Sequence, residues 1–314
     1  MNRRDLLRSA AALTAATMSR ARKTAARTAA ATGDTGGAGA SAAPISRRIP
    51  SSGEEIPVIG LGTSRTFEVG VTAAEREPRR AVLEAFFARG ARLIDTSPMY
   101  STAERVLGEL LTPEMHARAF LATKVWTRGA RAGIEQMTHS EQLLGAKPLD
   151  LIQVHNLLDL DTQLATLREW KAAGRVRYIG VTHYTVSGQE DLERVVSREP
   201  LDFVQLNYSP VTRAAERRLL PLAAERGVAV LVNRPFEDGG VFGRTRGKPL
   251  PAFAADLDAA SWGQLILKFI AAHPAVTCII PATASVAHLT DNLAAGRGRL
   301  PDARQRELIA AALG

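Results

Sequence analysis

The sequence has little of what defines several protein classes. Its single cysteine, Cys278, excludes an internal disulfide and a cysteine-rich zinc site, and we expect no bound metal. With 25 glycines and 16 prolines among 314 residues, the chain is not collagen-like. It has no apolar run of 18 or more residues, so we expect no integral membrane insertion, and it has no repeat of the solenoid kind. An apolar fraction of 46% is instead typical of a globular domain.

The positive charge of the chain is concentrated at its N-terminus. The formal net charge is +8 and the pI is near 10.1, values that alone would suggest a nucleic-acid or membrane-surface partner. Residues 1–50 contain nine basic and two acidic residues, whereas the rest of the chain contains 31 basic and 30 acidic residues. Because a phosphate-binding surface needs clustered lysine and arginine on the fold itself, we expect no nucleic-acid partner.

Residues 1–44 are predicted to be a signal-like, disordered leader and a flexible linker. The pair Arg3-Arg4 precedes a short, weakly apolar run at 10–16, and this order resembles a twin-arginine export signal. Residues 24–43 are almost entirely alanine, threonine, glycine and serine, which is typical of a linker. The resemblance implies a periplasmic or otherwise exported protein, with the twin-arginine machinery as a partner. The alternative is a basic tail on a cytoplasmic protein.

Strand-like and helix-like patterns alternate along the predicted domain, residues 45–314. A hairpin is expected at 45–49 and 55–58, around the turn residues Ser51-Ser52-Gly53. Short apolar runs predict strands at 59–62, 92–95, 119–124, 149–155, 176–181, 203–206, 228–232 and 276–281. Apolar residues at helical spacing predict helices at 78–89, 102–111, 131–144, 162–173, 189–197, 214–225, 261–272 and 286–294.

This alternation predicts an α/β fold, and a (β/α)8 TIM barrel preceded by a short β-hairpin is the favoured architecture. A doubly wound open sheet is the alternative. Such a sheet usually carries G-x-G-x-x-G after its first strand. Here Gly60-Leu61-Gly62-Thr63 supplies the first two glycines but not the third, which favours the barrel.

Polar side chains end several of the predicted strands. Asp95 ends the second strand, Lys124 the third and His155 the fourth, and Tyr100 follows Asp95 by five residues. In a barrel these residues meet at the C-terminal face, where active sites lie. Taken singly, each has a structural explanation as a packing residue, a core histidine or an ion pair. Their occurrence together indicates a functional site.

The sequence resembles the aldo-keto reductase superfamily over about residues 45 to 300. The matching segments are 94–100 with Glu104 and Leu107-Gly108, then Ala122-Thr123-Lys124, 150–155, 174–181, 205–210, and 280–283 with 291–293. The resemblance implies a (β/α)8 barrel that reduces an aldehyde or ketone to an alcohol by hydride transfer from NADPH or NADH. Its partner would be a small-molecule carbonyl substrate.

The resemblance assigns a role to each of the four strand-end residues. Tyr100 would donate the proton, and Lys124 would lower the pKa of its phenol. Asp95 would hold Lys124 in its charged form. His155 would hydrogen-bond the carbonyl oxygen of the substrate.

The resemblance also implies a set of cofactor contacts, some of which depart from the family pattern. The usual Ser-Asn pair after the fifth strand is replaced by Thr182-His183, and the aromatic residue that usually stacks on the nicotinamide by Asn233. Phe236 or Tyr208 could compensate for the missing ring. The expected contacts are Gly62, Thr63, Thr182, His183, Gln205, Asn233, Arg234, Ala282, Thr283, His288 and Asn292.

The residues expected near a 2′-phosphate are weak anion ligands. The resemblance places Ala282-Thr283 where the family often has Lys-Ser, and His288 where it often has arginine. Thr283, Ser285 and His288 would hold a phosphate more weakly than lysine and arginine do. NADP(H) is favoured by the resemblance, and NAD(H) is the alternative. A cofactor-binding regulatory module without turnover is the alternative function, and Asn233 is the residue that leaves room for it.

Substrate specificity is expected to depend on loops. The segment 233–260 is long and carries Arg244, Arg246 and Lys248, which would either steer an anionic group or be solvated. Trp126, shortly after Lys124, would either line the pocket or pack in the core.

Overall fold

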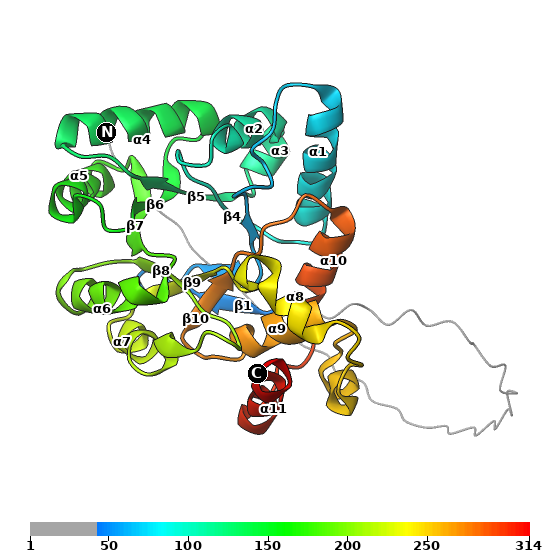
Figure 1. Cartoon of the computed structure of the whole chain (residues 1–314). Helices are drawn as coiled ribbons and strands as arrows, with labels where there is room; N and C mark the ends of the chain where they lie inside the picture. The colour runs from blue at the N-terminus through cyan, green and yellow to red at the C-terminus, as the bar shows by residue number, and fades with distance from the viewer. Residues whose placement is uncertain (1–42) are drawn as a thin grey trace, which may run out of the picture. The chain divides into compact units, whose positions relative to one another are not determined.

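The computed structural model describes residues 43–314 (Figure 1). The predictions made for the leader, and for most of the linker, lie outside the described residues. Within 43–314 no helix is both long and apolar enough to cross a membrane. The same residues contain no group of three or more His, Cys, Asp and Glu side chains arranged to hold a metal ion.

Eight parallel strands form the barrel that the alternating pattern predicted, and the doubly wound open sheet was the wrong alternative. Neighbouring strands follow each other in chain order from β3 to β10. Parallel bridges between Ile59 and Ile279 and between Gly62 and Ala282 join the two edges. The strands are β3 (Leu61–Gly62), β4 (Leu93–Asp95), β5 (Phe120–Val125), β6 (Leu149–His155), β7 (Val176–Thr182), β8 (Phe203–Asn207), β9 (Ala229–Asn233) and β10 (Val276–Ile279).

The predicted N-terminal hairpin closes one end of the barrel. Strands β1 (Ser46–Arg48) and β2 (Glu55–Pro57) pair antiparallel. Ile49 and Ile56 beside them are fully buried and pack with Phe120 and other side chains from the barrel interior. The interior is therefore a filled core, as is usual for this architecture, and the open end lies at the carboxyl ends of the strands.

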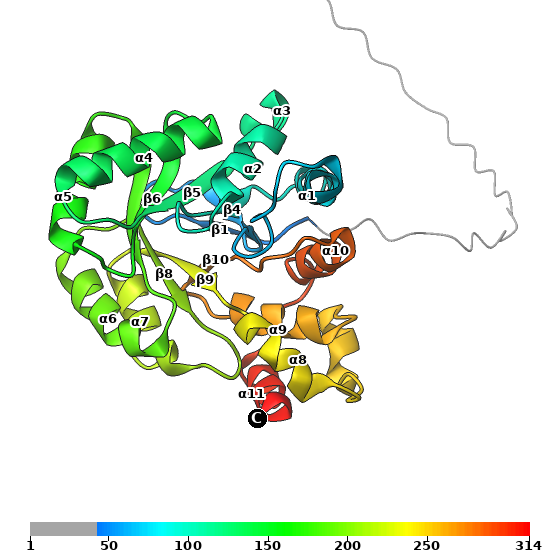
Figure 2. The same cartoon turned by 45° about the horizontal axis from the view of Figure 1, so that its top comes forward.

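Helices surround the strands, as Figure 2 shows. They are α1 (Ala73–Ala88), α2 (Ala103–Leu110), α3 (Pro113–His116), α4 (Ala130–Leu144), α5 (Leu160–Ala172), α6 (Gln189–Arg198), α7 (Leu219–Glu225), α8 (Gly240–Thr245), α9 (Trp262–Ala271), α10 (Val286–Ala295) and α11 (Ala303–Leu313). Four short 3-10 helices are η1 (Val186–Gly188), η2 (Ala214–Glu216), η3 (Glu237–Gly239) and η4 (Ala252–Leu257).

Several predicted boundaries are wrong for local reasons. Helix α1 begins five residues before the predicted start at Pro78, because Thr72 and Glu75 form a capping box there. Strand β10 ends at Ile279 and not at Pro281, since proline has no N–H to donate to a ladder. The predicted helix 214–225 is divided into η2 and α7. Helices α3, α8 and α11 were not predicted.

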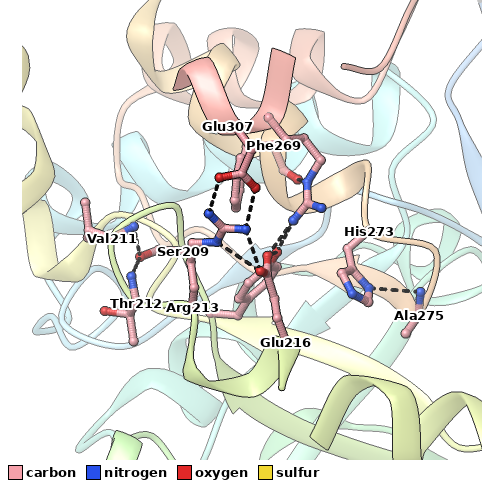
Figure 3. A network of polar contacts seen from close by, with 11 residues as sticks. Ser209, Val211, Thr212, Arg213, Glu216, Phe269, His273, Ala275 and Glu307 are labelled. Carbon is pink, nitrogen blue, oxygen red and sulfur yellow. Dashed lines mark hydrogen bonds and ion pairs between the residues drawn. The ribbon is translucent and has the colours of Figure 1, made fainter. Parts of the chain in front are cut away.

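Helix α11 is held by a charged network shown in Figure 3. Arg213 bridges Glu216 and Glu307, with Nη2 at 2.7 Å from an oxygen of each. Arg306 of α11 lies 2.6 Å from Glu216, which also accepts a hydrogen bond from the hydroxyl group of Tyr208. This network ties the C-terminal helix to the segment that follows β8.

Candidate active site

A cavity of about 1090 Å³ opens at the carboxyl ends of the barrel strands. Thirteen of the fifteen predicted site residues line it: Gly62, Thr63, Asp95, Tyr100, His155, Thr182, Gln205, Asn233, Arg234, Ala282, Thr283, His288 and Asn292. Lys124 lies behind the cavity wall against Asp95, and His183 lies outside the lining. The barrel thus brings together residues that are up to 230 positions apart between Gly62 and Asn292.

Asp95 and Lys124 form a buried ion pair between the neighbouring strands β4 and β5. Lys124 Nζ donates to Asp95 Oδ1 at 2.6 Å and to the carbonyl oxygen of Thr96 at 2.7 Å. Burial alone would lower the pKa of Lys124, but the Asp95 carboxylate and the Tyr100 phenol outweigh it and hold that pKa above its usual value. The lysine is therefore charged at neutral pH.

Tyr100 stands in the turn after β4 with its ring facing that ammonium group. Lys124 Nζ is 5.1 Å from the centroid of the Tyr100 ring. Burial raises the pKa of Tyr100, and the charge of Lys124 lowers it by less than burial raises it. Lys124 thus lowers this pKa as expected, but desolvation is the larger effect and the pKa is raised. The phenol is protonated at neutral pH and available as a donor.

His155 ends β6 and is a neutral imidazole. Burial and the nearby Lys124 charge lower its pKa to about 3. Its ring lies edge-on to Tyr100, with the centroids 6.3 Å apart. Ser97 Oγ lies 3.4 Å from Nδ1 and accepts a hydrogen bond from the Met99 N–H. If the Ser97 hydroxyl donates to Nδ1, the ring proton is on Nε2, so this geometry permits the tautomer that donates from Nε2.

An amide network extends from Asp95 across the cavity wall. Gln205 Nε2 donates to Asp95 Oδ2 at 2.9 Å. Gln205 Oε1 accepts from Thr182 Oγ1 and from Asn233 Nδ2, each at 3.2 Å. Gln153 Nε2 is a longer donor to the same Asp95 oxygen, at 3.4 Å. Gln153 was not predicted as a site residue, although a glutamine within the apolar strand 149–155 was a signal for it.

His183 is the predicted cofactor contact that the structure places elsewhere. Its ring stacks on Tyr184, with the planes 10° apart, and its Nδ1 lies 3.2 Å from Thr185 Oγ1. The ring also covers Gly188, where an added Cβ would lie 2.2 Å from Nδ1. Tyr184, which was not predicted as a site residue, lines the cavity instead.

Charged residues at the rim of the cavity come from the segments after β3 and β9. Asp238 Oδ2 lies 2.9 Å from Arg234 Nη2 and 3.9 Å from Arg65 Nη1. Arg65, Arg234, Glu237 and Asp238 all have positive φ, between 48° and 60°. A positive φ strains the backbone of residues other than glycine, and residues with such strain are concentrated at functional sites. Arg65 and Asp238 were not predicted.

The predicted long loop 233–260 contains short helices, and its basic residues Arg244, Arg246 and Lys248 do not line the cavity. Arg244 Nη1 and Lys248 Nζ donate to the carbonyl oxygens of Leu313 and Ala312, each at 3.0 Å. Cations at the C-terminus of a helix are stabilising. These two residues therefore hold the end of α11 and do not steer a ligand.

Aromatic side chains form much of the apolar lining. Trp126 and Phe236 line the cavity, and so do Met99 and Phe242, so of the two alternatives for Trp126 the structure shows the position in the pocket. Tyr208 is fully buried, donates to Glu216 and is absent from the lining, so it does not compensate for the missing ring.

The end of the cavity formed by α9 and α10 has no lysine or arginine among its described lining residues. Thr283 and His288 line it, but Ser285 does not. Asp291 accepts hydrogen bonds from Ser261 Oγ and Gln264 Nε2, both at 2.6 Å, and so joins the two helices. This end offers few strong ligands for a phosphate group.

The sequence profile of the aldo/keto reductase family matches residues 58–311. The chain is 29% identical over 262 residues to methylglyoxal reductase YeaE of Escherichia coli, covering 79% of this chain and 88% of that protein. It is 26% identical to aldo-keto reductase str7 of Strobilurus tenacellus, covering 74% of this chain and 80% of that protein.

Solved structures agree with these sequence matches. An aldo-keto reductase from Klebsiella pneumoniae in complex with NADPH superposes with a TM-score of 0.70 at 26% identity, covering 85% of this chain and 94% of that one. The thermostable aldo-keto reductase Tm1743 shares the fold with a TM-score of 0.71 at 24% identity, covering 86% of this chain and all of that one.

Proposed function

Because the chain belongs to the aldo/keto reductase family and is an NAD(P)-dependent oxidoreductase, we propose that it reduces an aldehyde or ketone to an alcohol with Tyr100 as general acid. The observation that carries this proposal is the Asp95–Lys124 pair beside the Tyr100 ring at the wall of a large cavity. A buried, charged lysine next to a protonated phenol is suited to releasing and regaining one proton.

The cavity suits a nicotinamide dinucleotide in size and in lining. Its volume of about 1090 Å³ exceeds what a small carbonyl substrate alone requires. Amide and hydroxyl groups of Thr182, Gln205 and Asn233 form the wall beside the proton donor. When bound, the nicotinamide supplies the hydride, so the protein has to orient the reactants and supply the proton.

Four residues have separate roles in donating the proton to the substrate. Tyr100 Oη donates its proton to the oxygen of the carbonyl group as charge develops there. Lys124 stabilises the phenolate that remains, and Asp95 keeps the ammonium in place. His155, neutral because of its lowered pKa, donates a hydrogen bond from Nε2 to the same oxygen without competing for the proton.

NADP(H) is the proposed cofactor, with NAD(H) as the alternative. Two structures of aldo/keto reductase from K. pneumoniae, one with NADP and one with NADPH, are 25% and 26% identical to this chain. Thr283 and His288 are the residues available near a 2′-phosphate. They form weaker bonds to phosphate than arginine or lysine would, so we expect only a small preference for NADPH.

The proposed substrate is a small carbonyl compound. Two relatives in E. coli are named methylglyoxal reductases. Met99 precedes Tyr100 and Trp126 lies beside His155, with ring centroids 6.5 Å apart, so the two donors Tyr100 and His155 have an apolar rim. Phe242 also lines the cavity. An aldehyde would place its oxygen at those two donors and its carbon chain against the rim.

One experiment separates turnover from cofactor binding alone. The full-length protein is assayed for NADPH and NADH oxidation with methylglyoxal and a panel of aldehydes and ketones. The proposal predicts turnover that is lost in Tyr100→Phe, with cofactor affinity nearly unchanged. Binding of cofactor without turnover of any carbonyl compound would favour a regulatory module. The observation that favours this alternative is the asparagine at position 233, where the family usually has an aromatic residue. If neither cofactor binds, both functions are wrong.

We also propose that the leader directs export by the twin-arginine route, which carries folded proteins. The proposal rests on the sequence of residues 1–44, most of which lie outside the described residues. Arg3→Lys with Arg4→Lys should retain the protein in the cytoplasm, whereas the wild-type chain should appear in the periplasmic fraction. If the variant and the wild-type chain were distributed equally between cytoplasm and periplasm, the export proposal would be wrong, and residues 1–44 would be a basic tail.

A further inference from the structure

The charge of Asp95 determines how a row of neutral amides is oriented. A carboxylate can only accept hydrogen bonds. Its Oδ1 accepts from Lys124, and its Oδ2 accepts from Gln205 Nε2. The amide nitrogen of Gln205 must therefore face Asp95, and its oxygen must face the opposite way.

The orientation of Gln205 in turn determines that of Asn233. Gln205 Oε1 accepts from Asn233 Nδ2 and from the hydroxyl of Thr182, both at 3.2 Å. If the Asn233 amide were rotated, its oxygen would face the oxygen of Gln205, and neither atom can donate. Asn233 Oδ1 therefore points away from Gln205, and the Thr182 hydroxyl proton is already used.

Two buried carbonyl oxygens of the network have no partner among the described residues, Gln153 Oε1 and Asn233 Oδ1, and of these two residues only Asn233 lines the cavity. Buried acceptors are usually satisfied, so an unpaired one at a cavity wall indicates a ligand that donates there. The matching ligand group is an N–H or O–H donor, since a carboxylate or phosphate would meet the oxygen with repulsion.

His183, the residue directly after β7, does not contribute a polar group to this wall of the cavity. His183 packs on Tyr184 and Gly188 and is not part of the lining. Asn233 at the end of β9 therefore supplies a polar amide group to the cavity, whereas His183 after β7 supplies no polar group. Its side chain has no ring that could stack on a flat ligand.

We propose that Asn233 recognises the nicotinamide through its carboxamide, accepting a hydrogen bond from the amide N–H₂ at Oδ1, in place of His183 and in place of ring stacking. The inference rests on the proposed function, because it requires a nicotinamide cofactor. It goes further in stating which atom of this chain meets which group of the cofactor. It also explains why a small amide can replace an aromatic residue at this position.

The test measures binding and needs no turnover. The probes are NADP⁺ and its 3-acetylpyridine analogue, in which a methyl group replaces the carboxamide N–H₂. Trp126 and Trp262 line the cavity, so quenching of tryptophan fluorescence in the full-length protein reports binding. One neutral hydrogen bond corresponds to a preference of up to about tenfold, and we expect the wild-type chain to bind NADP⁺ more tightly by several-fold to about tenfold.

Two variants at Asn233 and one control complete the test. Asn233→Ala should bind both probes with nearly equal Kd. Asn233→Tyr should bind both, again with a ratio near one, because a ring stacks on either probe. Asn156→Ala is the matched control, since Asn156 also lines the cavity with an unpaired buried Oδ1 but has no bond to Gln205, and it should keep the wild-type ratio.

The outcomes distinguish this inference from the proposed function. If the wild-type chain binds neither NADP⁺ nor NAD⁺, the proposed function is wrong, and the inference with it. If NADP⁺ binds but the wild-type ratio is near one, or Asn233→Ala retains the preference, only the inference is overturned. Loss of the ratio in Asn156→Ala alone would place the recognition at Asn156, directly after β6, and also overturn the inference. Thermal melts of each variant identify loss of fold, and Asn233→Tyr provides a second reading if Asn233→Ala unfolds.

Discussion

Lys124 and Asp95 form a 2.6 Å ion pair in which the two side chains are 0% and 3% exposed. A buried pair of this kind is costly to break, because removal of one partner leaves a charge without compensation in a medium of low polarity. The pair also orients Gln205 through the second oxygen of Asp95, so one interaction supports both the proton donor and the wall of the cavity.

Removal of either partner should lower stability strongly. We expect Lys124→Met to cost about 3–5 kcal/mol in the free energy of unfolding, and Asp95→Leu a similar amount. The double variant should be less destabilised than the sum of the two, because no buried charge remains. Urea denaturation of all four proteins measures this coupling. Additive losses would mean that the pair contributes nothing beyond its separate side chains.

Replacement of the Tyr100 hydroxyl should remove chemistry and leave binding intact. We expect Tyr100→Phe to lower kcat by about 10² to 10⁴, the usual contribution of a general acid, while the Kd for NADPH changes less than twofold. Pre-steady-state and fluorescence measurements separate the two quantities. A residual kcat near that of the wild type would assign the proton to another group.

The rate of carbonyl reduction should fall only at high pH. Burial raises the pKa of Tyr100 above its usual value of about 10, so the phenol is protonated across the neutral range. A general acid is active below its pKa and inactive above it. The profile of kcat/KM should therefore be flat through neutral pH and decline only in strongly alkaline solution. A decline centred near pH 7 would contradict the assignment.

Acid should destabilise the fold partly through His155. Its pKa is lowered from 6.5 to about 3, so the unfolded chain binds a proton that the folded chain does not. This contribution to stability is complete above about pH 6.5 and is lost as the pH falls toward 3, for a total of about 4–5 kcal/mol. His155→Gln, which cannot be protonated, should show a flatter dependence in denaturant titrations between pH 7 and 4. Parallel curves for the two proteins would mean that His155 is protonated in the folded state.

Gly108 should not tolerate a side chain. It lies in α2 against α4, where an added Cβ would be 1.9 Å from the carbonyl oxygen of Leu143. Backbone cannot move aside cheaply, so we expect Gly108→Ala to cost about 3 kcal/mol in the free energy of unfolding, at the upper end for overpacking. Gly243→Ala in α8 is the control, because nothing lies within 4 Å of its added Cβ. It should be neutral or slightly stabilising. Equal melting temperatures for both variants would contradict the close approach of α2 and α4.

Local sequence patterns were sufficient for the eight barrel strands, for most of the helices and for the strand-end residues. Strand β6 has the predicted bounds, because its apolar residues Leu149, Leu151, Ile152 and Val154 are grouped between Pro148 and Asn156. Helix α8 could not be predicted, since Gly240 and Gly243 disfavour a helix and the tertiary contacts override that preference. The rim pair of Arg65 and Asp238 joins residues 173 positions apart, and no local pattern marks such a contact.

The sequence by itself determined the order of strands and helices and the positions of Asp95, Tyr100, Lys124 and His155 along the chain, because periodicity and residue type are local properties. Only the tertiary structure decided what surrounds them. Burial decided that the pKa of Tyr100 is raised and that of His155 lowered, since desolvation depends on every neighbouring atom. Packing turned His183 away from the cavity, and the hydrogen bonds from Asp95 through Gln205 set the direction of the Asn233 amide.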